Sequence, residues 1–273
     1  MKISASILIY DSPMAQIRKA VDSLLSEGIE NIILLYNGNQ RGYLRREDFP
    51  EARIFEIDNH GYGAGHNVAI RMAADEGMNY HLVMNADVRW SAPVVIPMVR
   101  YLDTHPDAVL LSPKTFYPDG TFQHTARMLP TPFDMLLRLI PGSCLTHRRR
   151  RYLLADRDID RELNVPYLLG NFLLFRMDAI KDVGMFDERF FMYPEDIDIT
   201  RRLHRIGETL YWPEVSVIHD HARASRRNFR LFAIHLRNMI RYFNKWGWFF
   251  DIERRRFNRS VLTSPVVTSG KHR

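Results

Sequence analysis

The sequence predicts an α/β fold in which a mostly parallel sheet is flanked by helices. In the first half of the chain, apolar segments of strand length alternate with segments that have the apolar spacing of helices. The strand segments are apolar throughout, as in parallel sheets covered on both faces. With 273 residues, 46% of them hydrophobic, the chain can bury a substantial core in one large domain, alone or with an appendage.

The first elements follow this alternation. Strands are expected at 2–10, 31–36, 53–58, 80–84 and 108–112, and helices between Ser12-Pro13 and Gly28, over 67–76 and over 92–104.

The second half is less regular. Prolines, an arginine run and an acidic stretch mark 130–164 as a loop-rich insertion with room for a short helix. Two apolar segments, 165–169 and 172–176, flank Gly170-Asn171, and the sheet pattern resumes around 208–218.

A helical appendage is expected at the end of the chain. Apolar residues recur at helical spacing over 228–250, and the residues after about 258 are polar, as in disordered tails. The expected parts are a sheet domain over 1–222, a basic and aromatic helical segment over 223–257 and a disordered tail over 258–273.

The net charge of +6 and the pI near 9.5 come from clustered arginines. Such clusters attract the phosphates of nucleic acids, nucleotide diphosphates or anionic lipids, although a solvated basic face has the same composition. The clusters are Arg148 to Arg151, Arg223 with Arg226, Arg227 and Arg230, and Arg254 to Arg256.

Cysteine content and hydropathy indicate the compartment. The single cysteine, Cys144, excludes an intramolecular disulfide framework and a cysteine-only zinc site. The first apolar run is too short for a signal peptide, and no window is long and apolar enough to span a bilayer. We therefore expect a cytoplasmic protein.

A glycine-rich loop lies between the third strand and the next helix, over 59–67. Its alternating glycines would let the backbone approach a ligand, and the following helix start would favour a phosphate. The spacing does not fit G-x-G-x-x-G, because counting from Gly61 reaches His66 and counting from Gly63 reaches Val68. A dinucleotide site is therefore disfavoured, and a simple tight turn stays open as an alternative.

Two further motifs carry carboxylates. Asp87, in Asn85-Ala86-Asp87, follows a very apolar strand, at the sheet edge where open α/β folds bind ligands, and could hold Mg²⁺ or Mn²⁺. The alternative is a polar turn.

The second motif places Glu195, Asp196 and Asp198 after Pro194, at a helix start that favours ionised carboxylates. This pattern is also ordinary helix-start chemistry. His219, at a later strand end, could complete a metal shell or be structural.

In their order along residues 3–220, these motifs resemble the inverting glycosyltransferases of family 2, which have the GT-A fold. The resemblance rests on the glycine-rich loop, N-A-D-V in place of D-x-D, G-N-F-L-L-F-R, G-x-F-D-E-R-F-F-M-Y-x-E-D-I-D and a late histidine. G-Y-G-A-G-H-N and the Arg- and aromatic-rich C-terminal helix are most similar to the rhamnosyltransferases of O-antigen and cell-wall synthesis.

The resemblance implies roles for the donor side. The nucleotide base and ribose would lie near Asn37, Asp58 and Asn59, and the base or diphosphate near Gly63, Gly65 and Asn67. The divalent cation, Mg²⁺ or Mn²⁺, would be held by Asp87 and His219. Asn85 replaces the first acidic residue of D-x-D, which leaves Asp87 as the safer ligand.

The resemblance also implies roles for the reaction. Asp196 would be the catalytic base, Glu195 and Asp198 would support it, and Gly170 and Asn171 would shape the acceptor side. The implied reaction is a single displacement that inverts the anomeric carbon, with the cation stabilising the departing diphosphate.

The implied partners are a nucleotide-diphosphate sugar and a glycan or polyprenyl-diphosphate-linked acceptor of bacterial surface polysaccharide synthesis. The first choice of donor is dTDP-rhamnose and the second a UDP-hexose. The basic C-terminal segment could place the protein peripherally on an anionic membrane, at the inner face of the plasma membrane. A sugar nucleotidylyltransferase and a basic nucleic-acid-binding module are less favoured, because the chain has neither a glycine-rich loop after the first strand nor a nucleic-acid-binding motif.

Overall fold

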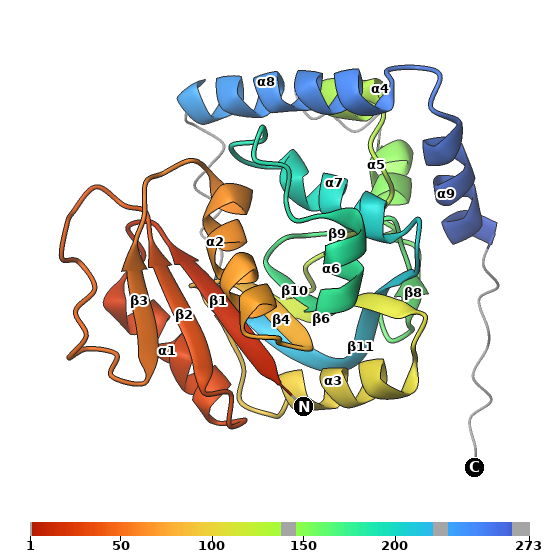
Figure 1. Cartoon of the computed structure of the whole chain (residues 1–273). Coiled ribbons are helices and arrows are strands. Elements are labelled where there is room, and N and C mark those ends of the chain that lie inside the picture. The colour runs from red at the N-terminus through yellow and green to blue at the C-terminus, as the bar shows by residue number, and fades with distance from the viewer. Residues whose placement is uncertain (1, 138–145, 221–228, 264–273) are drawn as a thin grey trace, which may run out of the picture.

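One mixed sheet organises the protein, and helices cover both of its faces (Figure 1). The computed structural model describes residues 2–137, 146–220 and 229–263. In spatial order the strands of this sheet are β3 (Ala52–Glu56), β2 (Asn31–Tyr36), β1 (Ile3–Ile9), β4 (Tyr80–Asn85), β10 (Phe172–Arg176), β6 (Ala108–Phe116), β11 (Glu208–His219) and β5 (Val88–Arg89), with β8 (Leu163–Asn164) beside β11. A small separate sheet pairs β7 (Ala126–Arg127) with β9 (Tyr167–Leu168).

The predicted α/β class is confirmed. Strands β3, β2, β1 and β4 pair in parallel with one another, and β6 pairs in parallel with β11, whereas β10 runs antiparallel between β4 and β6. The chain enters β10 from the edge where β4 ends, and the amide of Asn85 donates to the Asn171 carbonyl at 3.1 Å. The segment Gly170-Asn171 therefore lies at the carboxyl edge of the parallel strands, where open α/β sheets bind ligands.

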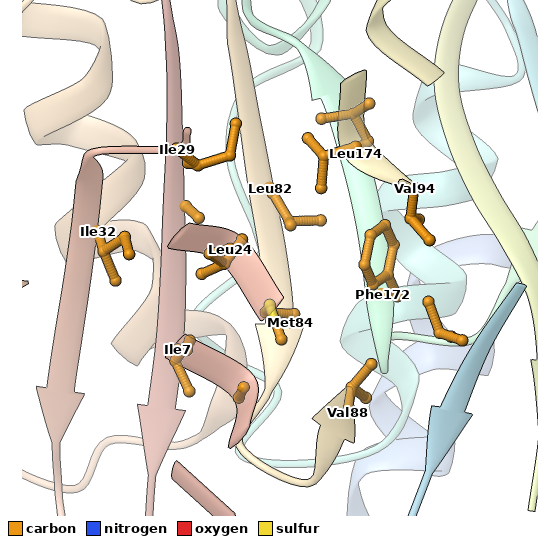
Figure 2. Packing of buried hydrophobic residues seen from close by; sticks show 14 of the residues in the cluster. Ile7, Leu24, Ile29, Ile32, Leu82, Met84, Val88, Val94, Phe172 and Leu174 are labelled. Carbon is orange, nitrogen blue, oxygen red and sulfur yellow. The ribbon is translucent and has the colours of Figure 1, made fainter. Parts of the chain in front are cut away.

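Two helix layers enclose the sheet. Helices α1 (Met14–Leu25) and α3 (Val95–Thr104) pack on one face, and α2 (Tyr62–Asp75), α6 (Met177–Val183) and α7 (Pro194–Leu203) pack on the other. Figure 2 shows the first of these cores, in which Ile7 and Leu82 of the sheet meet Leu24 of α1. Alternate residues of a strand point to opposite faces, so continuous apolar strands supply both cores.

The insertion and the C-terminal part add four helices among the described residues. These are α4 (Pro132–Leu137), α5 (Thr146–Tyr152), α8 (Phe229–Trp246) and α9 (Ile252–Thr263). The disordered tail predicted from 258 is wrong for 258–263, which continue α9, because Phe257 and Val261 are buried against the rest of the protein. Residues 264–273, Cys144 and most of the second arginine cluster lie outside the described residues. None of the helices in the described ranges combines the length and hydropathy that crossing a bilayer requires.

Buried ion pairs fasten α8 and α9 to α7. Arg201 of α7 is 1% exposed; two of its nitrogens lie 2.7 Å from the carboxylate oxygens of Asp251, and its guanidinium lies 4.1 Å from the Trp246 ring. Asp198, also buried, accepts from Arg202, Lys245 and the Trp246 indole. Removing one member of such a pair leaves an uncompensated buried charge, so the C-terminal helices are strongly coupled to α7.

Helix α2 begins at Tyr62, five residues before its predicted start, so Gly63 and Gly65 are helical rather than part of a loop. Gly61 precedes it with φ +106°, and a Cβ there would lie 2.1 Å from the Phe191 carbonyl oxygen. The next amide, that of Tyr62, donates to the same carbonyl at 2.9 Å. A close backbone contact with a distant segment therefore fixes the start of α2, and local spacing could not reveal it.

A buried polar network lies between β1, β4 and α2. The Ser6 hydroxyl is 2.8 Å from His66 Nδ1 and 2.9 Å from His81 Nε2, and Ser4 is 2.7 Å from His81 Nδ1. Burial lowers the pKa of His81 to about 3, and burial followed by the charge of His81 lowers the pKa of His66 well below its ordinary value. Both imidazoles are therefore neutral in the folded protein at neutral pH.

We expect acid to destabilise the fold through these histidines. Below about pH 6.5 the unfolded chain binds protons that the folded chain excludes, so the unfolding free energy falls by up to about 1.4 kcal/mol per pH unit for each histidine. Urea unfolding between about pH 7 and pH 5 measures this slope. The His81→Gln variant should show a shallower slope, and an unchanged slope would contradict the assignment.

Candidate active site

Asp87 and His219 meet at the carboxyl edge of the sheet. Asp87 follows β4 and His219 ends β11, and the Oδ1 and Nε2 atoms are 3.2 Å apart. Gln123 Oε1 lies 2.9 Å from His219 Nδ1 and accepts its N–H, which leaves the Nε2 lone pair directed toward Asp87. Neighbouring ligands of an octahedral cation with bonds of about 2.1 Å are about 3 Å apart, so this pair fits Mg²⁺ or Mn²⁺.

The protein would supply only part of such a cation shell. Within the described ranges, no group of three or more His, Cys, Asp or Glu side chains is arranged to hold a metal ion. Mg²⁺ and Mn²⁺ commonly take one or two protein ligands and complete their shell with phosphate and water oxygens. The pair Asp87 and His219 therefore suits a cation that binds together with a phosphate ligand.

Tyr62 connects this region to the Gly170 turn. Its hydroxyl lies 3.0 Å from Asn85 Oδ1 and 2.5 Å from the Gly170 carbonyl oxygen, and Asn85 Nδ2 lies 3.3 Å from His219 Nε2. Burial, followed by the charges of Glu195, Asp196 and Asp87, raises the pKa of the Tyr62 phenol well above its ordinary value. The phenol is therefore a neutral hydrogen-bonding group that lies within the electrostatic influence of Asp87 and of the Glu195 and Asp196 pair.

The first turn of α7 carries Asp196. Tyr193, the residue that precedes α7, has φ +91°, which is a strained conformation for a residue with a side chain. Backbone strain of this kind is typical of functional sites. The Oδ2 atom of Asp196 accepts the Gly170 N–H at 3.0 Å and lies 3.5 Å from the Tyr167 hydroxyl, and Oδ1 accepts the Ile197 N–H at 2.8 Å. These donors hold the carboxylate in one orientation.

The neighbouring Glu195 differs in charge state. Burial, followed by the charge of Asp196, raises the pKa of Glu195. Two adjacent buried carboxyl groups resist being ionised together, so the proton belongs on Glu195 and the negative charge on Asp196. Asp196 is therefore the member of the pair that can accept a proton at neutral pH.

Asn37, Asp58 and Asn59 lie where the parallel strands β2 and β3 end. Asn37 is buried and its Nδ2 donates to Asn59 Oδ1 at 3.3 Å, while its Oδ1 has no hydrogen-bond partner among the described residues. Asp58 and Asn59 are exposed. A buried amide oxygen without a protein donor is suited to receive an N–H group from a ligand.

Three predicted ligand residues make close contacts with other parts of the protein. A Cβ on Gly63 would lie 2.7 Å from Phe186 Cβ, and one on Gly65 would lie 2.6 Å from the Leu8 side chain. Both amide hydrogens of Asn67 are used by the Phe186 carbonyl and Glu188, and its Oδ1 accepts the Phe186 N–H. These contacts give the three residues a role in the packing of α2, and their place near the nucleotide stays a prediction.

Asp198, which is predicted to support the base, lies on another side of α7. Residues two apart on a helix point about 200° apart, so Asp198 faces away from Asp196. It is fully buried against Arg202, Lys245 and Trp246. Asp198 therefore anchors the C-terminal helices to α7, and any support that it gives to Asp196 would act through that helix.

The predicted acceptor-side residues do lie beside Asp196. A Cβ on Gly170 would be 3.3 Å from Asp196 Cβ, which makes the approach tight. Asn171 is buried, and neither polar atom of its side chain has a partner in the described part of the chain. Unsatisfied buried amides are rare, and this one lies between Asn85 and Gly170, so it is a candidate contact for a sugar hydroxyl.

Sequence reasoning missed Tyr62, Gln123 and Arg127. Tyr62 stands inside the glycine-rich motif, but its importance depends on the early start of α2. Gln123 lies in a short loop with no motif, next to an isolated bridge between Phe116 and Phe122. The guanidinium of Arg127 lies 5.6 Å from the Tyr167 ring. Burial lowers the pKa of Arg127, but the neighbouring Tyr167, Tyr152 and Asp196 have the larger combined effect, so the pKa is raised.

Comparison with known proteins identifies relatives of this chain. Residues 5–184 match the family model described as Glycosyl transferase family 2. The chain is 29% identical over 225 residues, covering 76% of this chain and 71% of the relative, to the N-acetylglucosaminyl-diphospho-decaprenol L-rhamnosyltransferase of Mycobacterium tuberculosis. It is 25% identical over 240 residues, covering 83% and 87%, to the Rhamnosyltransferase WbbL of Escherichia coli.

Solved structures share the fold. GalNAc-T7 with UDP, GalNAc and Mn²⁺ superposes with a TM-score of 0.68 at 14% identity, covering 98% of this chain and 52% of that chain. The mannosyltransferase PcManGT from Pyrobaculum calidifontis with GDP-Man and Mn²⁺ gives 0.55 at 15% identity, covering 89% and 63%. At these identities the likeness establishes a common architecture.

The contrast between Asn67 and Asn171 can be tested by stability. We expect Asn67→Ala to lower the unfolding free energy by about 2–4 kcal/mol, because three buried hydrogen bonds are lost. Asn171→Ala should cost about 1 kcal/mol or less, because its amide has no protein partner to leave unsatisfied. Urea unfolding of both variants measures the difference, and equal losses would contradict a ligand-binding role for Asn171.

Proposed function

Because the chain belongs to glycosyl transferase family 2, we propose that it transfers L-rhamnose from dTDP-rhamnose to a polyprenyl-diphosphate-linked or glycan acceptor, with inversion, in bacterial surface polysaccharide synthesis. Family membership supports sugar transfer over a nucleotidylyltransferase, and the two rhamnosyltransferase relatives support the donor. One observation carries the mechanism: the contacts of Tyr62 and Gly170 join the Asp196 carboxylate to the Asp87 and His219 pair at a single sheet edge.

The donor would lie along the carboxyl ends of β2, β3 and β4. The unpartnered Asn37 Oδ1 suits the N3–H group that thymine and uracil share. Because both bases offer this donor, Asn37 fits dTDP-rhamnose and a UDP-hexose equally. Asp58 and Asn59 are exposed beside it and would contact the ribose.

Asp87 and His219 would hold a divalent cation against the diphosphate of the donor. Such a cation, when bound, neutralises the charge that develops on the departing nucleotide diphosphate. Gln123 orients the His219 ring by accepting from Nδ1, and Asn85 Nδ2 lies 3.3 Å from Nε2, the nitrogen that would face the cation.

Asp196 would act as the general base. The acceptor hydroxyl gives its proton to the Asp196 carboxylate while its oxygen attacks the anomeric carbon, and the bond from that carbon to the diphosphate oxygen breaks. The Gly170 N–H and the Ile197 N–H hold the carboxylate in place for this step. On the acceptor side, Arg127 places a positive charge near Asp196, where it suits an acceptor phosphate.

A donor panel tests the function as a whole. Thermal shift and slow donor hydrolysis, measured with Mn²⁺ or Mg²⁺ for dTDP-rhamnose, UDP-hexoses and GDP-mannose, should show the strongest response to dTDP-rhamnose. A stronger response to a UDP-hexose would move the assignment to that donor.

For Asp196→Asn we expect transfer to fall by about 10²–10⁴-fold, because the amide cannot accept the proton. Donor binding should change little. Glu195→Gln is the matched control: since Glu195 is already protonated, its neutral isostere should keep activity within about tenfold of the parent. Transfer by Asp196→Asn within a few-fold of the parent would rule out the base role.

For Asp87→Ala we expect the affinity for the donor to lose its dependence on Mn²⁺. Calorimetric titration of the nucleotide diphosphate with and without Mn²⁺ measures this directly. A second variant, Gln123→Leu, should weaken Mn²⁺-dependent binding by about 10–100-fold through His219. Asp75→Ala, which removes an exposed carboxylate at the far end of α2, serves as the control. Unchanged Mn²⁺ dependence in Asp87→Ala would contradict the metal role.

A further inference from the structure

Helix α8 exposes an apolar stripe. Phe232, Leu236 and Ile240 are large exposed side chains that recur every fourth residue, so they lie on one face of the helix. This stripe flanks the face of α8 that packs on the protein through Met239 and Tyr242. In Figure 1, α8 lies across the outside of the molecule, above α7 and far from the sheet.

The loop between α8 and α9 extends this surface. Trp248 folds back on the last turn of α8, where its ring contacts Phe243 and its N–H donates to Asn244 at 2.9 Å. Beyond it, Phe250 is 90% and Ile252 is 81% exposed, and Phe249 is exposed as well. Large exposed apolar side chains gathered over residues 232–252 mark an interaction site rather than ordinary protein surface.

Arginines fix the loop in this conformation. The buried Arg254 donates to the Gly247 and Trp248 carbonyls, and Arg255 donates to the Phe249 carbonyl at 3.3 Å. These guanidinium groups hydrogen-bond to the backbone carbonyl groups of the loop. The Phe249 and Phe250 side chains remain exposed to solvent. The loop is therefore held as a fixed protrusion.

The segment that carries this surface has an excess of positive charge. Residues 229–263 contain eight Arg and Lys residues and two acidic residues, and both acidic ones, Asp251 and Glu253, are ion-paired with Arg201. Beside the loop, a cavity of about 840 Å³ between α4, α5 and α9 is lined by Trp248 and Phe249 and by Arg148, Arg151, Arg255 and Arg259. Its one acidic lining residue, Asp134, is paired with Arg148.

We propose that the α8 stripe and the α8–α9 loop dock on an anionic phospholipid bilayer. Aromatic and aliphatic side chains enter the interface between headgroups and acyl chains, and the surrounding arginines meet lipid phosphates. A second copy of the chain fits this surface less well, because a two-fold contact through the stripe would bring arginine-rich surfaces together.

The docking surface is linked to the site. Asn238 of α8 donates to the Met192 carbonyl at 3.0 Å, and His235 packs at 4.7 Å on Tyr193, the strained residue that precedes α7. A bilayer on the outer side of α8 therefore lies next to the helix that carries Asp196. This placement would present the site to an acceptor embedded in the same bilayer.

Vesicle sedimentation with the full chain tests the proposal. Binding should be seen with equimolar phosphatidylcholine and phosphatidylglycerol at low salt, should weaken at high salt, and should be absent with phosphatidylcholine alone. The double variants Phe249→Ser with Phe250→Ser and Leu236→Gln with Ile240→Gln should each reduce binding by at least about tenfold. Arg237→Gln and Arg255→Gln should each reduce it by about fivefold.

Matched controls separate docking from general effects. Ile206, 50% exposed at the opposite end of α7, gives the apolar control Ile206→Gln, and exposed Arg100 on α3 gives the charge control Arg100→Gln. Both should bind as the parent does. Thermal unfolding should be unchanged in the apolar variants, in Arg237→Gln and in both controls, since the altered side chains are exposed, whereas Arg255→Gln also loses the hydrogen bond to the Phe249 carbonyl.

Two outcomes would overturn the proposal. One is a parent protein that does not bind anionic vesicles, or variants that bind them as the parent does. The other is a dimer in sedimentation velocity that Leu236→Gln with Ile240→Gln dissociates while vesicle binding persists, which would assign the stripe to a second copy. Neither outcome bears on the donor panel, so failure of docking and failure of the proposed function are distinguishable.

Discussion

The two polar groups of Gly170 hold the site together. Its N–H binds the Asp196 carboxylate, and its carbonyl lies against the Tyr62 hydroxyl, which also reaches Asn85 beside His219. A side chain at this position would press on Asp196, so the residue must be small. One short turn before the antiparallel strand β10 thus ties together three segments that are far apart in the chain.

Helix α7 transmits constraints in two directions. Its first turn presents Asp196 to the Gly170 turn, while Asp198 and Arg201 on its other sides are sealed in buried ion pairs with α8 and α9. Separating a buried ion pair of this kind is costly, because each partner would remain as a buried charge without its counter-ion. The C-terminal helices are therefore part of the support of the base, and a surface that positions α8 also positions the catalytic edge.

Much of this arrangement could be predicted because it is local. Continuous apolar strands identified the α/β class, and the position of Asp87 after an apolar strand predicted its place at the ligand-binding edge, whereas Asn37 and Asn59 came from the family resemblance. The helix-start chemistry at Pro194 correctly located the acidic turn of α7. For Gly63, Gly65, Asn67 and Asp198 the structure adds packing contacts that the sequence did not indicate, because the direction of these residues depends on packing rather than on sequence spacing.

The amino-acid sequence by itself determined the order of strands and helices, the basic character of the C-terminal segment and the family motifs, since all of these depend on neighbours along the chain. Tertiary structure alone decided that α2 begins at Tyr62, that Gln123 orients His219 and that α9 continues to Thr263. Each of these follows from a contact between residues far apart in sequence, such as Gly61 against Phe191. Local patterns carry no record of such contacts, because they exist only once the sheet has brought the segments together.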